Sequence, residues 1–86
     1  MSFLTPHELE MYKPRFLCSL NRLANGLSDN PASSDDVYDD IGIGAELRAV
    51  DSLVQDAIES GFITRGRGRE ISLTIEGVRW CRERCK

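Results

Sequence analysis

Apolar positions recur every three to four residues in three stretches of the chain, and this spacing predicts amphipathic helices. The first stretch spans residues 14–25, with the inward positions Phe16, Leu17, Leu20, and Leu23 or Ala24. The second spans residues 45–60, with the inward positions Leu47, Val50, Leu53, Val54, Ala57 and Ile58. The third spans residues 75–85, where one face carries Val78, Cys81 and Cys85, with Trp80 beside it.

Capping residues and prolines set the expected ends of the first helices. Thr5 followed by Pro6 and by Glu8 three residues after the cap is a helix start, predicted near Pro6. Pro14 would remove a hydrogen bond from a helix interior, so we expect a break or kink there. The break would separate an N-terminal extension helix, residues 1–13, from a core of residues 14–86.

Further helix boundaries are set by small polar residues and glycines. Gly26 is a typical helix stop, and residues 27–32 carry a loop signal. Ser33 or Ser34 can cap a short acidic helix that runs through Ile41. A turn over residues 42–44 then leads into the helix of residues 45–60, which Gly61 ends.

Two short alternating runs, residues 62–64 and 70–74, predict β-strands. Between them lies Arg65-Gly66-Arg67-Gly68-Arg69, in which glycine allows positive backbone angles. The sequence therefore predicts a β-hairpin with a basic tip. Thr74 follows the second strand and can cap the last helix.

The order helix, short helix, turn, helix, hairpin, helix resembles the winged helix-turn-helix. Residues 53–65, Leu-Val-Gln-Asp-Ala-Ile-Glu-Ser-Gly-Phe-Ile-Thr-Arg, are similar to the end of the recognition helix and the first wing strand of MarR/PadR-like transcriptional regulators. The segment Leu73-Thr74-Ile75-Glu76-Gly77 looks like the "LTxxG" segment after the wing. The resemblance, over residues 33–82, implies an α+β fold: one small winged-helix domain, with three or four helices, a C-terminal two-stranded β-hairpin wing and a final helix.

Charge is unevenly distributed along the 86 residues, whose net charge is −3. Residues 1–63 carry four basic and eleven acidic groups, a balance of −7, whereas residues 64–86 carry seven basic and three acidic groups, a balance of +4. Any positive field that attracts nucleic acid must therefore come from the C-terminal end.

Cysteine usage and hydropathy predict a cytoplasmic protein outside the membrane. No apolar run approaches the ~20 residues of a spanning helix, and no secretory signal begins the chain. The three cysteines are an odd number and suggest no secreted disulfide framework. Cys81 and Cys85, four apart, and the single His7 are poorly spaced for zinc, and no catalytic constellation is present, so we expect neither a metal, nor a cofactor, nor an enzyme.

The leading hypothesis is double-stranded DNA binding. Arginines alternating with glycines can approach phosphates or the minor groove, which singles out Arg65, Arg67 and Arg69, although the loop could also be solvated and inert. The resemblance adds readout by outward positions of the 45–60 helix, with these contacts to the major groove: Arg48, Ser52 and Gln55. Glu46, Asp51, Asp56 and Glu59 oppose this, because they lie near the same surface.

A second hypothesis is a protein-interaction winged helix that binds a basic partner without nucleic acid. Its docking surface would be the acidic group Asp35, Asp36, Asp39 and Asp40. The terminal helix could form a homodimer through Trp80 and its apolar stripe, or that stripe could belong to the core. Its basic residues, Arg79, Arg82, Arg84 and Lys86, could contact phosphates or complement the negative end of the helix.

Overall fold

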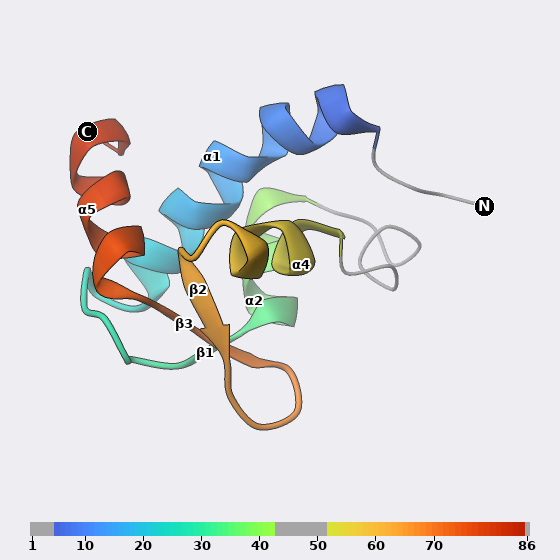
Figure 1. Cartoon of the computed structure of the whole chain (residues 1–86). Helices are drawn as coiled ribbons and strands as arrows, with labels where there is room; N and C mark the ends of the chain where they lie inside the picture. The colour runs from blue at the N-terminus through green and yellow to red at the C-terminus, as the bar shows by residue number, and fades with distance from the viewer. Residues whose placement is uncertain (1–4, 43–51, 86) are drawn as a thin grey trace.

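Four helices and three short strands make up the part of the chain that the computed structural model describes, residues 5–42 and 52–85 (Figure 1). In chain order they are α1 (Pro6–Leu23), β1 (Ala32–Ser33), α2 (Ser34–Ile41), α4 (Ser52–Glu59), β2 (Ile63–Arg65), β3 (Glu70–Leu73) and α5 (Ile75–Arg84). This α+β arrangement, with a hairpin before the final helix, is compatible with a winged helix.

α1 begins where the sequence predicts. The amide of Glu8 donates to Thr5 Oγ1 at 3.2 Å, and the amide of Thr5 donates to Glu8 Oε1 at 3.1 Å. This reciprocal pair is a capping box, and Pro6 occupies the first turn, where its missing N–H costs nothing.

The predicted break at Pro14 is wrong, because α1 runs through this residue as one helix of 18 residues. Pro14 and Glu10, whose carbonyl loses its helical donor, are both exposed, so water can replace the missing hydrogen bond. On the other side of the helix, Leu9 and Tyr12 pack against the core before the proline, and Phe16 packs there after it. Burial of residues before and after Pro14 thus keeps α1 one unbroken helix.

The boundaries of α2 agree with the sequence. Ser33 is the N-cap, since its side chain accepts from the Asp35 amide at 3.2 Å, and Gly42 ends the helix at φ 78°. For the predicted 45–60 helix, residues 52–59 are confirmed as α4 and end before Gly61. Residues 45–51 of that prediction, Arg48 among them, lie outside the described residues.

The sheet is antiparallel with the strand order β1-β3-β2, so the structure adds one strand to the predicted two-stranded hairpin. The hairpin itself is confirmed, with Ile63 opposite Leu73 and Arg65 opposite Ile71. The added strand β1 pairs Ala32 with Ile71 on the other side of β3. Two residues are too short to show a period-two pattern, so the sequence carried no signal for this strand.

The core lies where helices α1, α2, α4 and α5 meet one face of the sheet. The rings of Phe16 and Tyr38 pack with their centroids 5.5 Å apart. Around them the fully enclosed apolar side chains are Leu17, Leu20, Val37, Leu53, Val54, Ala57, Ile63, Ile71, Leu73 and Cys81. Most of the apolar positions predicted from helical spacing are therefore confirmed as core positions. In α1 the inward alternative is Ala24, which is buried, and not Leu23, which is 41% exposed. Leu47 and Val50 lie outside the described residues.

The start of α5 is fastened to the chain just before β2. The Thr74 amide donates to the Phe62 carbonyl at 3.0 Å, and Thr74 Oγ1 donates to the Gly61 carbonyl at 2.7 Å. The same hydroxyl caps α5 by accepting from the Gly77 amide at 3.1 Å. A Cβ at Gly77 would stand 2.1 Å from the Phe62 carbonyl oxygen, so only glycine allows this close approach.

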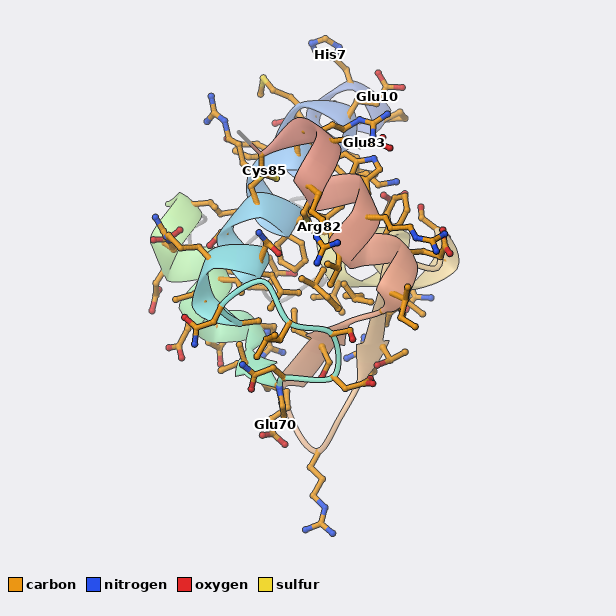
Figure 2. All side chains as sticks on the ribbon, turned by 90° about the vertical axis from the view of Figure 1, so that its left-hand side faces the viewer. His7, Glu10, Glu70, Arg82, Glu83 and Cys85 are labelled. Carbon is orange, nitrogen blue, oxygen red and sulfur yellow. A yellow bond between two sulfur atoms is a disulfide. The ribbon has the colours of Figure 1, made fainter. Side chains whose placement is uncertain are left out.

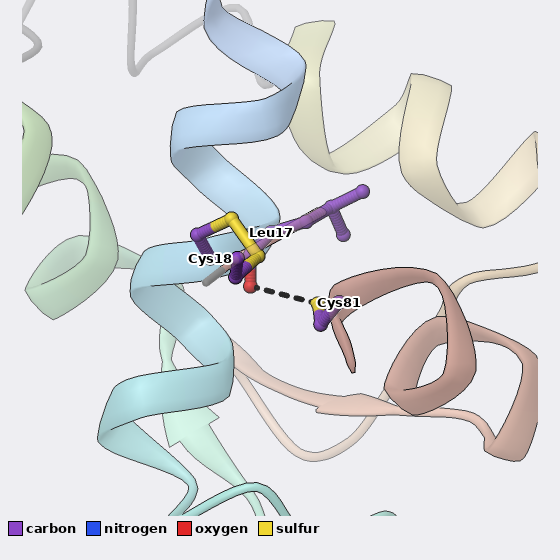
Figure 3. Close-up of a disulfide and its surroundings, with 4 residues drawn as sticks. Leu17, Cys18 and Cys81 are labelled. Atoms are coloured by element: carbon purple, nitrogen blue, oxygen red, sulfur yellow. Dashed lines mark hydrogen bonds between the residues drawn. A yellow bond between two sulfur atoms is a disulfide. The ribbon is translucent and has the colours of Figure 1, made fainter. Parts of the chain in front are cut away.

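A disulfide joins Cys18 in the middle of α1 to Cys85 at the end of α5 (Figure 3). The sequence predicts no such bond, because the helical spacing places Cys85 with Cys81 and gives no relation to Cys18, 67 positions away. The close packing of α1 and α5, invisible in a local pattern, places the two Cα atoms 5.6 Å apart.

Cys81 is the free cysteine of the described chain and belongs to the core. Its Sγ donates to the Leu17 carbonyl at 3.5 Å, a contact drawn in Figure 3. Burial raises the pKa of the Cys81 thiol to about 11, because the thiolate would lose its hydration. Cys81 is therefore a protonated packing residue at neutral pH.

The close approach at Gly77 predicts that Gly77→Ala destabilises the domain by about 1–3 kcal/mol, because a methyl group collides with the Phe62 carbonyl. Helix propensity alone predicts the opposite sign, a gain of about 1 kcal/mol. Urea unfolding of the variant and of Glu83→Ala, an exposed control on the same helix, measures the difference. A variant as stable as the wild type would mean that α5 does not dock this closely.

The disulfide predicts that reduction lowers the free energy of unfolding by on the order of 4 kcal/mol, the loop-entropy value for a bond closing 67 residues. Cys18 and Cys85 line a surface cleft of about 770 Å³, so a reductant reaches the bond without unfolding. Urea unfolding with and without a phosphine reductant measures the loss. Cys85→Ser should show the lower stability in both conditions, and a wild type indifferent to reductant would show that the bond does not form in solution.

Candidate nucleic-acid interface

The hairpin turn is built so that its tip projects from the sheet (Figure 1). The Gly66 amide donates to the Glu70 carbonyl at 2.7 Å, and the Glu70 amide donates to the Arg67 carbonyl at 2.9 Å. Between them Gly68 adopts φ 57°, a left-handed conformation that glycine enters without steric cost. The two hydrogen bonds make the tip a defined turn, and residues 65–70 are all exposed.

The three arginines predicted to bind phosphate have different surroundings in the structure. Arg67 lies at the tip, is exposed, and forms no ion pair within the described residues. Arg65 is the last residue of β2 and is exposed as well. Arg69 instead points back to α2, where its Nε lies 3.1 Å from Asp35 Oδ1.

The Arg69–Asp35 pair joins the hairpin to the N-terminus of α2. Beside it, the Ser34 amide donates to the Arg69 carbonyl at 2.8 Å, so backbone and side chain make the connection together. Asp35 stands in the first turn of α2, where a carboxylate also complements the helix dipole. Arg69 thus helps to position the hairpin, and the carboxylate of Asp35 offsets its charge.

On α4 the described part of the predicted readout surface is small. Ser52 is the first residue of the helix and is half-buried. Gln55 is exposed, with its Nε2 3.5 Å from Glu59 Oε1. Arg48, the third predicted readout residue, lies outside the described residues, so the structure brings together only Ser52 and Gln55.

A lysine that the sequence did not single out offsets an acidic residue of α4. Lys13 Nζ lies 3.1 Å from Asp56 Oδ2 and donates to Ser60 Oγ at 2.7 Å. The same ammonium lies 5.3 Å from the centre of the Phe62 ring. No local pattern could have shown this pairing, because Lys13 reaches α4 from α1 across 43 residues of chain.

Asp40 of α2 is held against α1. Ser19 Oγ donates to Asp40 Oδ2 at 2.6 Å, and Arg22 forms an ion pair with the same oxygen. The hydrogen bond from Ser19, followed by that from Arg22, lowers the pKa of the Asp40 carboxyl below its usual value of 3.8. Of the predicted acidic docking surface, Asp35 and Asp40 are therefore engaged inside the domain, while Asp36 stays exposed.

α5 divides into a buried stripe and a basic outer face. Val78 and Cys81 are buried, so the interpretation of the stripe as core is confirmed for them. Trp80 is half-buried against Phe62, with the ring centroids 5.6 Å apart. Arg84 lies 4.9 Å from the centre of the Trp80 ring.

Comparison of the chain with protein-family models, curated proteins and solved structures found no match. Within residues 5–42 and 52–85, no three histidine, cysteine or acidic side chains lie close enough together to hold a metal ion. Over the same residues, no helix has the length and apolar character needed to cross a bilayer.

The Asp40 cluster predicts an acid-dependent contribution to stability. Because the folded-state pKa of Asp40 is lowered, the contribution is present above the unfolded pKa and is lost as pH falls through the folded pKa. Asp40→Asn should thus be less stable than the wild type at pH 7, and the difference should narrow as pH falls below 4. Urea unfolding between pH 7 and 2 measures both. Asp36→Asn, which changes an exposed carboxylate of the same helix, serves as the control; a difference that does not vary with pH would contradict this role of Asp40.

Proposed function

We propose that this chain is a DNA-binding winged-helix protein, a small transcriptional regulator or accessory factor. The observation that carries the proposal is the exposed basic tip of the hairpin, with Arg67 between Gly66 and Gly68. Glycines there leave room for the backbone to approach a groove, while the guanidinium contacts phosphate oxygens or minor-groove acceptors.

The acidic composition opposes DNA binding less than the net charge suggests. Asp35, Asp40 and Asp56 each pair with a basic side chain of the domain, namely Arg69, Arg22 and Lys13. Pairing lowers the repulsion that these carboxylates would exert on phosphates, since each pair presents a dipole in place of a full charge. Arg67 has no such partner in the described chain and keeps its charge for a ligand.

In this proposal α4 and the segment before it supply base contacts. Arg48 would pair with guanine and Gln55 with adenine, and Ser52 would contact either a base or a phosphate. Gln55 is exposed as this role requires. A homodimer through the terminal helices would roughly double the contacts, and the proposed compartment is the cytoplasm, where the Cys18–Cys85 bond would have to persist against cellular thiols.

The alternative is a protein-interaction winged helix whose acidic second and third helices bind a basic partner. The balance of −7 over residues 1–63 favours it. The contacts of Asp35 and Asp40 within the domain reduce the charge that such a partner would meet. Asp36→Asn combined with Asp39→Asn would abolish capture of a basic partner under this alternative and would leave or improve duplex binding under the first.

The proposal predicts that Arg67→Ala weakens binding to a random-sequence duplex and flattens the salt dependence, with the slope of log K against log salt falling by about 0.9 for one lost phosphate contact. Fluorescence anisotropy at several salt concentrations measures the slope. Arg67 forms no ion pair in the described residues, so its removal should change stability by less than about 0.5 kcal/mol.

Arg84→Ala is the matched control, since it removes one arginine from α5 and none from the hairpin. The proposal expects this variant to bind as the wild type does. Equal slopes for the wild type and Arg67→Ala would remove the hairpin tip from the interface. Absence of duplex binding by the wild type at low salt would overturn the proposal as a whole.

A further inference from the structure

A groove of about 340 Å³ lies between α5 and the loop that comes after α1. The loop contributes Gly26, Leu27 and Ser28, and α5 contributes Ile75, Val78, Arg79 and Arg82. Figure 2 shows Arg82 on the side of α5 that faces this loop. The groove contains no residue of the hairpin or of α4, so a ligand could occupy it whether or not the hairpin binds DNA.

Two exposed apolar side chains stand on the walls of the groove. Leu27 is 57% exposed and Ile75 is 64% exposed, which makes them the most exposed large apolar side chains of residues 5–42 and 52–85. They stand on opposite elements, with Val78 buried between α5 and the core below. Two exposed apolar walls around a hollow are typical of a site that receives an apolar side chain.

The charge at the rim has one sign. Arg79 and Arg82 line the groove, and no carboxylate does. Arg79 has only an exposed contact with Glu76, at 3.5 Å and three residues away, of the kind that contributes little. Arg82 forms no ion pair within the described part of the chain. Both guanidiniums are thus placed to meet carboxylates brought by a ligand.

This charge pattern selects among the possible occupants. A second copy bound across a two-fold axis would set the same surface against itself and oppose arginine to arginine, which is unfavourable. The volume is at the lower end of the roughly 300–1,000 Å³ of ligand pockets, which suits one or two side chains better than a large cofactor. An apolar side chain flanked by carboxylates would pack against Leu27 and Ile75 and pair with the arginines at the rim.

We propose that this groove binds a short acidic segment of another protein, with one large apolar side chain between Leu27 and Ile75 and carboxylates on Arg79 and Arg82. The apolar contact provides burial, and the arginines provide specificity for acidic neighbours. The domain would then have two separate surfaces of basic character, the hairpin tip and this groove.

The test uses the full chain and a short fluorescein-labelled peptide in which a phenylalanine is flanked by glutamates. The peptide should bind, and its affinity should fall with salt, because the rim contacts are exposed. A peptide with glutamine in place of glutamate, and one with alanine in place of phenylalanine, should each bind more weakly. Equal binding of the glutamine peptide would overturn the role of the arginines.

Two pairs of variants locate the site. Ile75→Ser should weaken binding of the acidic peptide by about tenfold and Arg82→Gln by about fivefold. Met11→Ser, at an exposed apolar residue of α1, and Arg84→Gln, outside the groove on α5, should leave the affinity unchanged. Thermal unfolding of all four confirms that each variant is folded, and equal losses in the control variants would overturn the assignment.

Three other outcomes would also overturn the proposal. No binding of the acidic peptide at low salt would do so directly. A dimer in sedimentation that Ile75→Ser converts to monomer would show that a second copy covers the groove. Loss of duplex affinity in Arg82→Gln, with no peptide binding by the wild type, would assign the arginine to phosphate.

Discussion

The junction between Phe62 and the start of α5 is the contact on which the rest of the structure depends. At this point the chain enters β2, and after the hairpin it returns to the same carbonyl, which accepts from the Thr74 amide. Thr74 also binds the Gly61 carbonyl and caps α5, while Gly77 allows the helix to lie directly against the strand. The junction therefore closes the hairpin and orients α5 in one place.

The other long-range contacts depend on this junction in turn. α5 lies along α1, so that Cys81 meets the Leu17 carbonyl and Cys85 reaches Cys18. On the opposite side of the sheet, β1 pairs with β3 and brings the N-terminus of α2 beside Arg69. The hairpin is consequently held from both sides, and only its tip projects.

Ion pairs within the domain determine how the remaining charge is distributed on the surface. Ion pairs with basic side chains outside α2 and α4 offset the charge of three carboxylates on these helices. The negative charge that these helices present at the surface is therefore smaller than their composition suggests. Two groups of exposed basic side chains stand out, one at the tip with Arg67 and one on the outer face of α5 with Arg82. A net charge of −3 thus coexists with two local basic surfaces.

Local signals in the sequence predict most of the described helices and strands. The features that the sequence does not predict depend on long-range contacts. The capping box at Thr5, the cap at Ser33 and the hairpin were all readable, because each depends on residues within a few positions. The break predicted at Pro14 is wrong, because burial of residues on the other side of α1 outweighs the local effect of the proline. The disulfide, strand β1 and the Arg69–Asp35 pair join residues distant in sequence, and a single chain gives no pattern for such contacts.

DNA binding through the hairpin is tested most directly by an NMR titration of isotope-labelled protein with a random-sequence duplex at low salt. The amide signals of Gly66, Arg67 and Gly68 should shift, together with those of the exposed face of α4. The amide signals of Leu27 and Ile75 should not shift. Shifts confined to the groove beside α5, or none at all, would contradict binding through the tip.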